Sequence, residues 1–446
     1  MERKTRIWLG LSAAVLVGGG SVTGSGALAA TETAPRAAPP QAMDAAIGIR
    51  LAQEEGAPAG EGGEGGEGAV AVPGGEVRPM ADYRLLSTNP NDYQYDAAAQ
   101  IAAYGAVAHE SYGAAHAAAV ALRDAVTALL DAPGDATLAA AHDAWLAARP
   151  AYMATEAFRF YGGPIDGGGG PEGRLNGAPV RVDLIDYVAG DAAAGIVNDP
   201  AIPLTRQSIA AMNRAENPND ITAGWHVIEF LLWGQDTGIG SSGARPTTDF
   251  AAGEADNDRR RDYLANATQL LVNDLANVTA AWAPDSNNYR TTLGLMEPRN
   301  VVGRIFNGMA ILAGSEMAVI RLAEALETRD DSREHSRFSD ATIADFAANL
   351  EGIRSIYFGG STGAGFDVLL AGINPEANAR IIVTLDAAEA AIAALDEPFD
   401  AILASPPDSP LRAEASTAVE ALKDLGRALR DAGNRLGVFV LVPGLR

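Results

Sequence analysis

The chain has 446 residues, 48% of them hydrophobic and only 6% aromatic, which is enough for two domains with apolar cores. Its net charge of −24 excludes binding driven by the neutralisation of phosphates, so we expect no nucleic-acid partner. The absence of cysteine excludes disulfides, thiolate metal sites and cysteine nucleophiles. Because alanine dominates the apolar residues, the composition favours closely packed helices and predicts an all-α fold.

The first residues predict an export signal. A basic start at residues 3–6 precedes an apolar stretch at 7–17 and the small-residue cleavage sequence Ala-Leu-Ala at 27–29. We therefore expect residues 1–29 to be a signal peptide that is cleaved near Ala29. The alternative is an uncleaved signal anchor. Since no later segment reaches about 18 uninterrupted apolar residues, we expect no transmembrane segment in the mature chain.

Residues 30–80 predict a disordered linker. They are rich in Ala, Pro, Gly and Glu and include a Glu-Gly-Gly repeat at 61–67. Such a composition cannot bury enough apolar surface to order itself.

From residue 81 onward, apolar residues recur at spacings of three and four, which predicts helices. Pro, Gly and Asp residues mark the breaks between them. We expect two helical-bundle domains, an N-terminal one at 81–250 and a C-terminal one at 251–446. Similar aromatic-ended helices in the two halves indicate a duplication. The predicted helices cover 99–130, 136–161 with a kink at Pro150, 221–236, 259–282, 300–327, 340–357, 375–395 and 410–436.

The predicted helix at 221–236, with Asp220 as its expected cap, is apolar nearly all round and should therefore lie in a core. His226 and Glu229 are three residues apart, so they share one strip of this helix and should be buried together. A buried carboxylate needs a compensating partner. Gly224 is costly inside a helix and indicates the close approach of another helix or a ligand.

Three interpretations of the buried pair remain open on the residues alone. His226 and Glu229 could form a structural pair, supply two ligands to a metal ion, or act in general acid–base chemistry. The patterns HExxH, HxxEH and ExxH are absent, so neither the usual zinc peptidases nor the di-iron helical bundles fit.

Several stretches carry a resemblance to a known family. The sequence GWHVIE at 224–229 has the form GxHxxE and continues into FLLWGQD. Five further stretches lie before and after it, in the same order as in that family. They are TEAFRFYGGPID, GPEGRLNG, RVDLIDYVAG, RIFNGMAILAGSEMA and EHSRFSDAT. From about residue 90 onward, this chain resembles the iron-regulated branch of the imelysin-like family of bacterial envelope proteins.

The resemblance implies an all-α fold of two duplicated bundles with the GxHxxE helix near their interface. It also implies a periplasmic or cell-envelope location and a link to iron regulation, with envelope iron-uptake proteins as partners. The family was named for a proposed metallopeptidase activity. One His and one Glu do not supply the three protein ligands of a catalytic zinc, so we assign no catalytic residue.

Other residues in these motifs are second-rank ligand-binding candidates. They are Glu156, Arg159, Gly224, Asn307 and Glu316. Glu156 and Arg159 lie one turn apart and are expected to form an ion pair or to complete the site. We interpret the segment with Glu334, His335 and Asp340 as the cap of the next helix.

The sequence therefore predicts an envelope protein of iron acquisition that binds a cation or small polar ligand near the motif. His226 and Glu229 are the expected metal ligands, and a divalent metal or iron is the expected cofactor. The alternatives are a metal-dependent peptidase and an interaction platform in which the pair is purely structural.

Overall fold

The computed structural model describes residue 87 and residues 89–445. The predicted signal peptide at 1–29 and the predicted linker at 30–80 both lie outside the described residues. The described chain is helical, and its one β-type pairing is an isolated bridge between Val188 and Asp191. The predicted all-α fold is confirmed.

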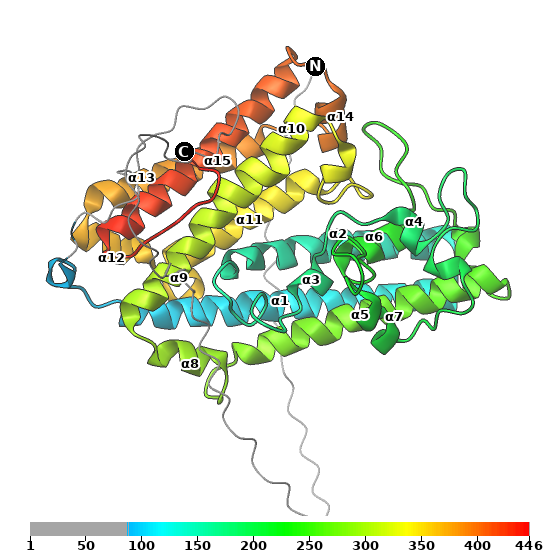
Figure 1. The fold of residues 1–446 in the computed structure, drawn as a ribbon, viewed down its shortest axis with the longest axis horizontal. Helices are drawn as coiled ribbons and strands as arrows, with labels where there is room; N and C mark the ends of the chain where they lie inside the picture. The colour runs from blue at the N-terminus through cyan, green and yellow to red at the C-terminus, as the bar shows by residue number, and fades with distance from the viewer. Residues whose placement is uncertain (1–86, 88, 446) are drawn as a thin grey trace, which may run out of the picture. The chain divides into compact units, whose positions relative to one another are not determined.

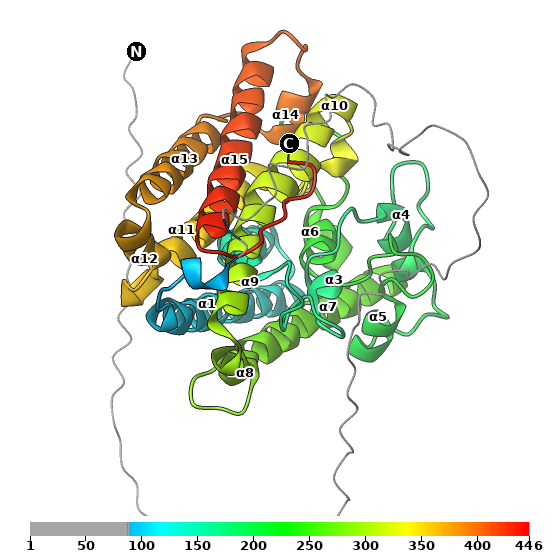
Figure 2. The same cartoon turned by 60° about the vertical axis from the view of Figure 1, so that its left-hand side comes forward.

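The long helices lie in two groups (Figures 1 and 2). In the first group, α1 (Ala98–Asp131) packs against α2 (Asp135–Met153) and α7 (Ala255–Ala281). The short helix α6 (Trp225–Trp233) packs against α2 and α7. Every side chain of α6 is buried, as its all-round hydrophobicity predicts.

The second group begins with α9 (Pro298–Ile311), which continues without a break into the π-helix η6 (Leu312–Ala323). The C-terminal helix α15 (Pro410–Arg435) packs against α9, η6 and α13 (Pro375–Ala393). Between the two groups, α11 (Thr342–Phe358) contacts both α2 and α13. The groups are therefore joined by packed side chains as well as by the chain.

Short helices connect the long ones. The remaining α-helices are α3 (Glu172–Leu175), α4 (Val182–Ile185), α5 (Arg206–Met212), α8 (Tyr289–Leu295), α10 (Glu324–Thr328), α12 (Phe366–Ile373) and α14 (Phe399–Ala404). The 3₁₀ turns are η2 (Pro90–Asp92), η3 (Ala154–Phe158), η4 (Ile196–Asn198), η5 (Thr247–Phe250), η7 (Asp331–Arg333) and η8 (Gly360–Thr362).

One predicted helix boundary on the way to the site is wrong. The helix expected to run to residue 161 passes through Pro150, ends as α2 at Met153 and is continued by the 3₁₀ turn η3. α7 begins just after the predicted domain boundary at residue 250, yet packs on α1. The division at 250 and the duplication stay predictions.

One described helix, α1, is long and apolar enough to cross a membrane by length and composition alone. The bent pair Thr342–Thr362 and Phe366–Ile373 passes the same test only if its arms, which meet at 92°, count as one span. Because α1 packs along α2 and α7, its apolar residues are also what a helix in a protein core needs.

Candidate functional site

The position of the site is set by the start of α6. Gly224 caps this helix with φ 96°, in the left-handed region that glycine tolerates. A Cβ there would lie 2.3 Å from the carbonyl oxygens of both Arg174 and Leu175. The close approach predicted from Gly224 is confirmed, but the helix starts four residues later than predicted, and Asp220 binds Arg181 at 2.8 Å instead of capping it.

His226 and Glu229 are both buried and in contact, with His226 Nδ1 3.0 Å from Glu229 Oε2. The other oxygen of Glu229 accepts three hydrogen bonds, from the amides of Phe338 and Ser339 at 3.1 and 3.0 Å and from the Ser339 hydroxyl at 2.7 Å. Burial raises the pKa of Glu229 to about 8, against the lowering effect of the Ser339 hydroxyl. Glu229 therefore holds the turn before α11.

Arg149 of α2 contacts His226 on the side of the ring that faces away from Glu229. Its side chain is fully buried and lies 3.2 Å from His226 Nε2, 3.0 Å from Asp345 and 2.6 Å from Asn176. Because a guanidinium only donates, Nε2 of His226 must accept, and the proton of the neutral ring is on Nδ1, facing Glu229. Burial, together with Arg149, holds the pKa of His226 well below its usual range.

This arrangement does not fit a metal ion at His226. Both ring nitrogens have protein partners, and the partner of Nε2 is a positive charge that would repel a cation. Both oxygens of Glu229 also accept hydrogen bonds. The role of His226 and Glu229 as metal ligands stays a prediction, and we derive no chemical step from it.

His335 is the second histidine of the site, and the centre of its ring lies 4.9 Å from the centre of the His226 ring. Its Nδ1 lies 2.9 Å from Asp345 Oδ2, which also accepts a hydrogen bond from the Ser336 hydroxyl at 2.6 Å. Burial, with Arg321 nearby, lowers the pKa of His335 to about 3, so the ring is neutral. Arg149 also lies 3.3 Å from Nδ1, but the ionised Asp345 is closer and can only accept, so Nδ1 carries the proton and donates to it. Nε2 then accepts, and no described residue bonds to it.

A second buried network surrounds Glu156. Its carboxylate pairs with Arg321 at 2.7 Å and with Arg159, and it accepts from Asn349 at 3.0 Å. Burial would raise the pKa of Glu156, but Arg321 and Arg159 outweigh it and hold it well below its usual range. Asn176 joins the two networks, since it accepts from Arg149 and donates to Glu156 at 2.9 Å. The predicted Glu156–Arg159 ion pair is confirmed.

A pocket of about 250 Å³ opens beside these networks. In it, Arg159 pairs with Glu172 at 2.9 Å and Arg321 with Glu316 at 3.1 Å, whereas exposed Arg214 has no ion pair with a described residue. The π-helix brings Glu316 and Arg321, five residues apart, onto one face. The lining residues are Arg159, Glu172, Asn176, Ala178, Pro179, Arg214, Glu316, Ile320, Arg321, Ser332, Arg333, Glu334 and His335.

The second-rank candidates separate into two sets. Glu156, Arg159 and Glu316 belong to the pocket or its supporting network, and Gly224 serves packing. Asn307 lies elsewhere: it donates to Phe439 O at 3.0 Å and accepts from a nearby amide, which fixes the C-terminal segment on α9.

Sequence reasoning missed the central members of the site. Arg149 and Asp345 lie in none of the motifs quoted above, and Asn176 lies in GPEGRLNG but was not chosen as a candidate. His335 was interpreted as part of a helix cap, which is wrong because α11 begins after Ala341 with no side-chain cap. Its free nitrogen could be recognised only after the fold placed Asp345 against its other side.

The chain is similar to known proteins over most of its length. Residues 108–429 match the profile of the family described as Imelysin, which is classed among the peptidases. Iron-regulated protein A of Synechococcus elongatus is 28% identical over 329 residues, which cover 70% of this chain and 80% of that protein.

Two solved structures share the fold. A protein described as an iron-regulated protein A precursor, from Parabacteroides distasonis, superposes with a TM-score of 0.59 at 18% identity and covers 80% of this chain and 98% of its own. An imelysin-like protein from Psychrobacter arcticum superposes with a TM-score of 0.57 at 17% identity, and the match covers 78% of this chain and 99% of that protein.

Proposed function

Because the chain belongs to the imelysin family, we propose that it is an exported protein of iron acquisition that binds a small anionic iron chelate in the pocket beside His335. The iron link is supported by the name of its relative in Synechococcus elongatus, and export by the signal expected at residues 1–29. We place the protein in the periplasm or cell envelope.

The observation that carries the proposal is the free acceptor nitrogen of His335 in a pocket with an unpaired arginine. Arg214 is a charge that a ligand carboxylate can neutralise, and guanidinium binds carboxylates in a two-pronged manner. A neutral imidazole with its other nitrogen fixed by Asp345 presents Nε2 in one orientation. Ferric citrate matches this chemistry, since it carries both carboxylates and a metal.

The experiment is calorimetric titration of the purified protein with ferric citrate, and with citrate alone, at low and moderate salt. We expect saturable binding that weakens about tenfold in Arg214→Ser, the loss of one charge-assisted contact. His335→Gln should also weaken binding, more for ferric citrate than for citrate.

The matched control is Arg206→Ser, which removes an exposed arginine of α5 that does not line the pocket. It should bind as the wild type does. Absence of binding to either probe, or equal weakening in both arginine variants, would refute the proposal. Binding of ferrous ion alone that is lost in His226→Ala and Glu229→Ala would instead support the predicted metal ligands.

A further inference from the structure

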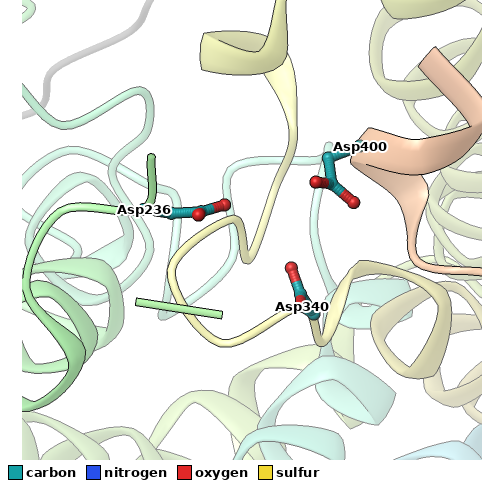
Figure 3. A group of neighbouring side chains, drawn as sticks. All are labelled: Asp236, Asp340 and Asp400. Carbon is teal, nitrogen blue, oxygen red and sulfur yellow. The ribbon is translucent and has the colours of Figure 1, made fainter. Parts of the chain in front are cut away.

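Three aspartates that do not line the pocket form a cluster of carboxylates. Asp236 follows the end of α6, Asp340 precedes α11, and Asp400 lies in the first turn of α14. Each offers an oxygen, and these oxygens all lie within 4.8 Å of one another. Figure 3 shows the three side chains pointing toward a common centre from three separate segments.

The charges in this cluster have no partner of opposite sign. None of the three aspartates forms an ion pair with a described residue. Arg337 lowers the pKa of Asp236, but its guanidinium hydrogen-bonds to the Val180 carbonyl at 3.2 Å. Burial, reinforced by Asp400 and Asp236, raises the pKa of Asp340 to about 6. The two neighbouring carboxyls therefore disfavour the charged form of Asp340.

Two unsatisfied groups point to a missing ligand. Oδ1 of Asp340 is buried and has no hydrogen-bond partner among the described residues. Glu334 is only 4% exposed, and neither of its carboxylate oxygens has a partner, although the Thr342 hydroxyl is close enough to lower its pKa. Glu334 lines the pocket, and the charges of Asp400 and Asp340 act on its carboxyl and help to raise its pKa. Buried polar groups normally have partners.

We propose that Asp236, Asp340 and Asp400 form a binding site for a hard divalent cation, with calcium as the ion that fits best, in reach of Glu334. All the donors are oxygen, the ligands that such cations prefer. Calcium binds oxygen at about 2.3–2.6 Å, so oxygens up to about 5 Å apart can share it, whereas magnesium at about 2.1 Å would need the cluster to contract.

The ion would join three segments of the fold. Asp400 already accepts from the Gly240 amide, and the Gly243 amide donates to Phe338 O at 2.9 Å, so the loops after α6 and before α11 touch. Asp340 directly follows Ser339, whose amide binds Glu229. A cation here would hold the same turn from its opposite side. Of the four acidic residues, Glu334 alone also lines the pocket, so the three aspartates can bind a cation without the proposed pocket ligand.

The experiment uses the full chain, freed of metal with EDTA and titrated with CaCl₂ in 100 mM NaCl while thermal unfolding is followed. The wild type should show a saturable, single-site rise in Tm with Ca²⁺, and a smaller one with Mg²⁺. Asp340→Asn is the sharpest variant, because the Asp340 side chain forms no hydrogen bond with a described residue and its φ of 57° suits asparagine. Without calcium it should unfold at a higher temperature than the wild type, since it relieves repulsion, yet bind Ca²⁺ at least tenfold more weakly.

Asp236→Asn is a second variant, since asparagine can still accept from the Gly238 amide. Glu397→Gln is the control: it removes an exposed charge three residues from Asp400. Unchanged calcium affinity in both aspartate variants, no calcium response in the wild type, or an equal loss in Glu397→Gln would overturn the proposal, the last because it indicates general charge screening.

Discussion

Arg149 is the residue on which the buried network depends most. It is the only cation that pairs with Asp345 among the described residues, and Asp345 is itself buried. Burial would raise the pKa of Asp345, but Arg149 outweighs it and holds the pKa below its usual range. Removing one partner of a buried pair leaves an uncompensated charge.

Arg149→Met should therefore lower the free energy of unfolding by about 3–5 kcal/mol, measured by denaturant unfolding at pH 7. Arg123→Met is the control. Its ion pair with Asp124 is exposed, so we expect a loss below about 1 kcal/mol. Adding Asp345→Asn to Arg149→Met should recover part of the loss, and a failure to do so would contradict the assigned charge pairing.

At the same scale, the sequence predicts pairs within one helix and misses partners from elsewhere. The burial and contact of His226 with Glu229 follow from a spacing of three on an apolar helix, and both are confirmed. Arg149 lies 77 residues away from His226, on α2. No periodicity connects the two, so the arginine that changes the chemistry of the pair is visible only in the fold.

At the scale of elements, the entry into α6 is fixed by glycine. The apolar pattern continues through residues 221–223, so pattern alone places the helix start too early, and the backbone of Gly224 decides it. The π-helix η6 is likewise invisible to the sequence, which predicts one helix over 300–327. Periodicity thus predicts where the helices lie but not the local departures that shape the site.

Gly224→Ala should destabilise the protein by about 2 kcal/mol or more, because its Cβ would clash with two carbonyl oxygens in a left-handed conformation. Gly372→Ala is the matched control within α12. Nothing lies within 4 Å of a Cβ at Gly372, so alanine there should stabilise by about 0.5–1 kcal/mol. Opposite signs in denaturant unfolding are expected, and equal signs would contradict the positive φ at Gly224.

At the scale of the whole molecule, composition predicts the all-helical class and periodicity predicts the long helices. The site, in contrast, forms where separate parts of the chain meet. His335, Arg321 and Arg159 reach the pocket from three segments. The acidic cluster likewise joins positions 236, 340 and 400. Contacts between such distant positions depend on how the two groups of helices pack, which no local pattern records.

The buried acids and histidines give the whole molecule a defined pH response. His226 and His335 are neutral when folded but protonate when unfolded, so their contribution to stability falls as pH drops below about 6.5. Glu334 acts in the opposite direction. Burial raises its pKa from 4.5 to about 8, so the folded state holds a proton that the unfolded state has lost, and its contribution falls as pH rises.

Comparing Glu334→Gln with the wild type isolates this contribution, because the histidines are common to both. Below the folded pKa, the wild type loses about 1.4 kcal/mol of unfolding free energy for each unit by which the pH rises. Between pH 6.5 and 8 the variant should therefore gain about 1.5 kcal/mol of stability relative to the wild type. Denaturant unfolding in EDTA at both pH values measures the gain. Calcium bound at the acidic cluster would lower the pKa of Glu334, so adding it should reduce the gain. A constant difference between the two proteins in EDTA would mean that folded Glu334 is already ionised at pH 6.5, and that its unpartnered carboxylate has a counter-charge.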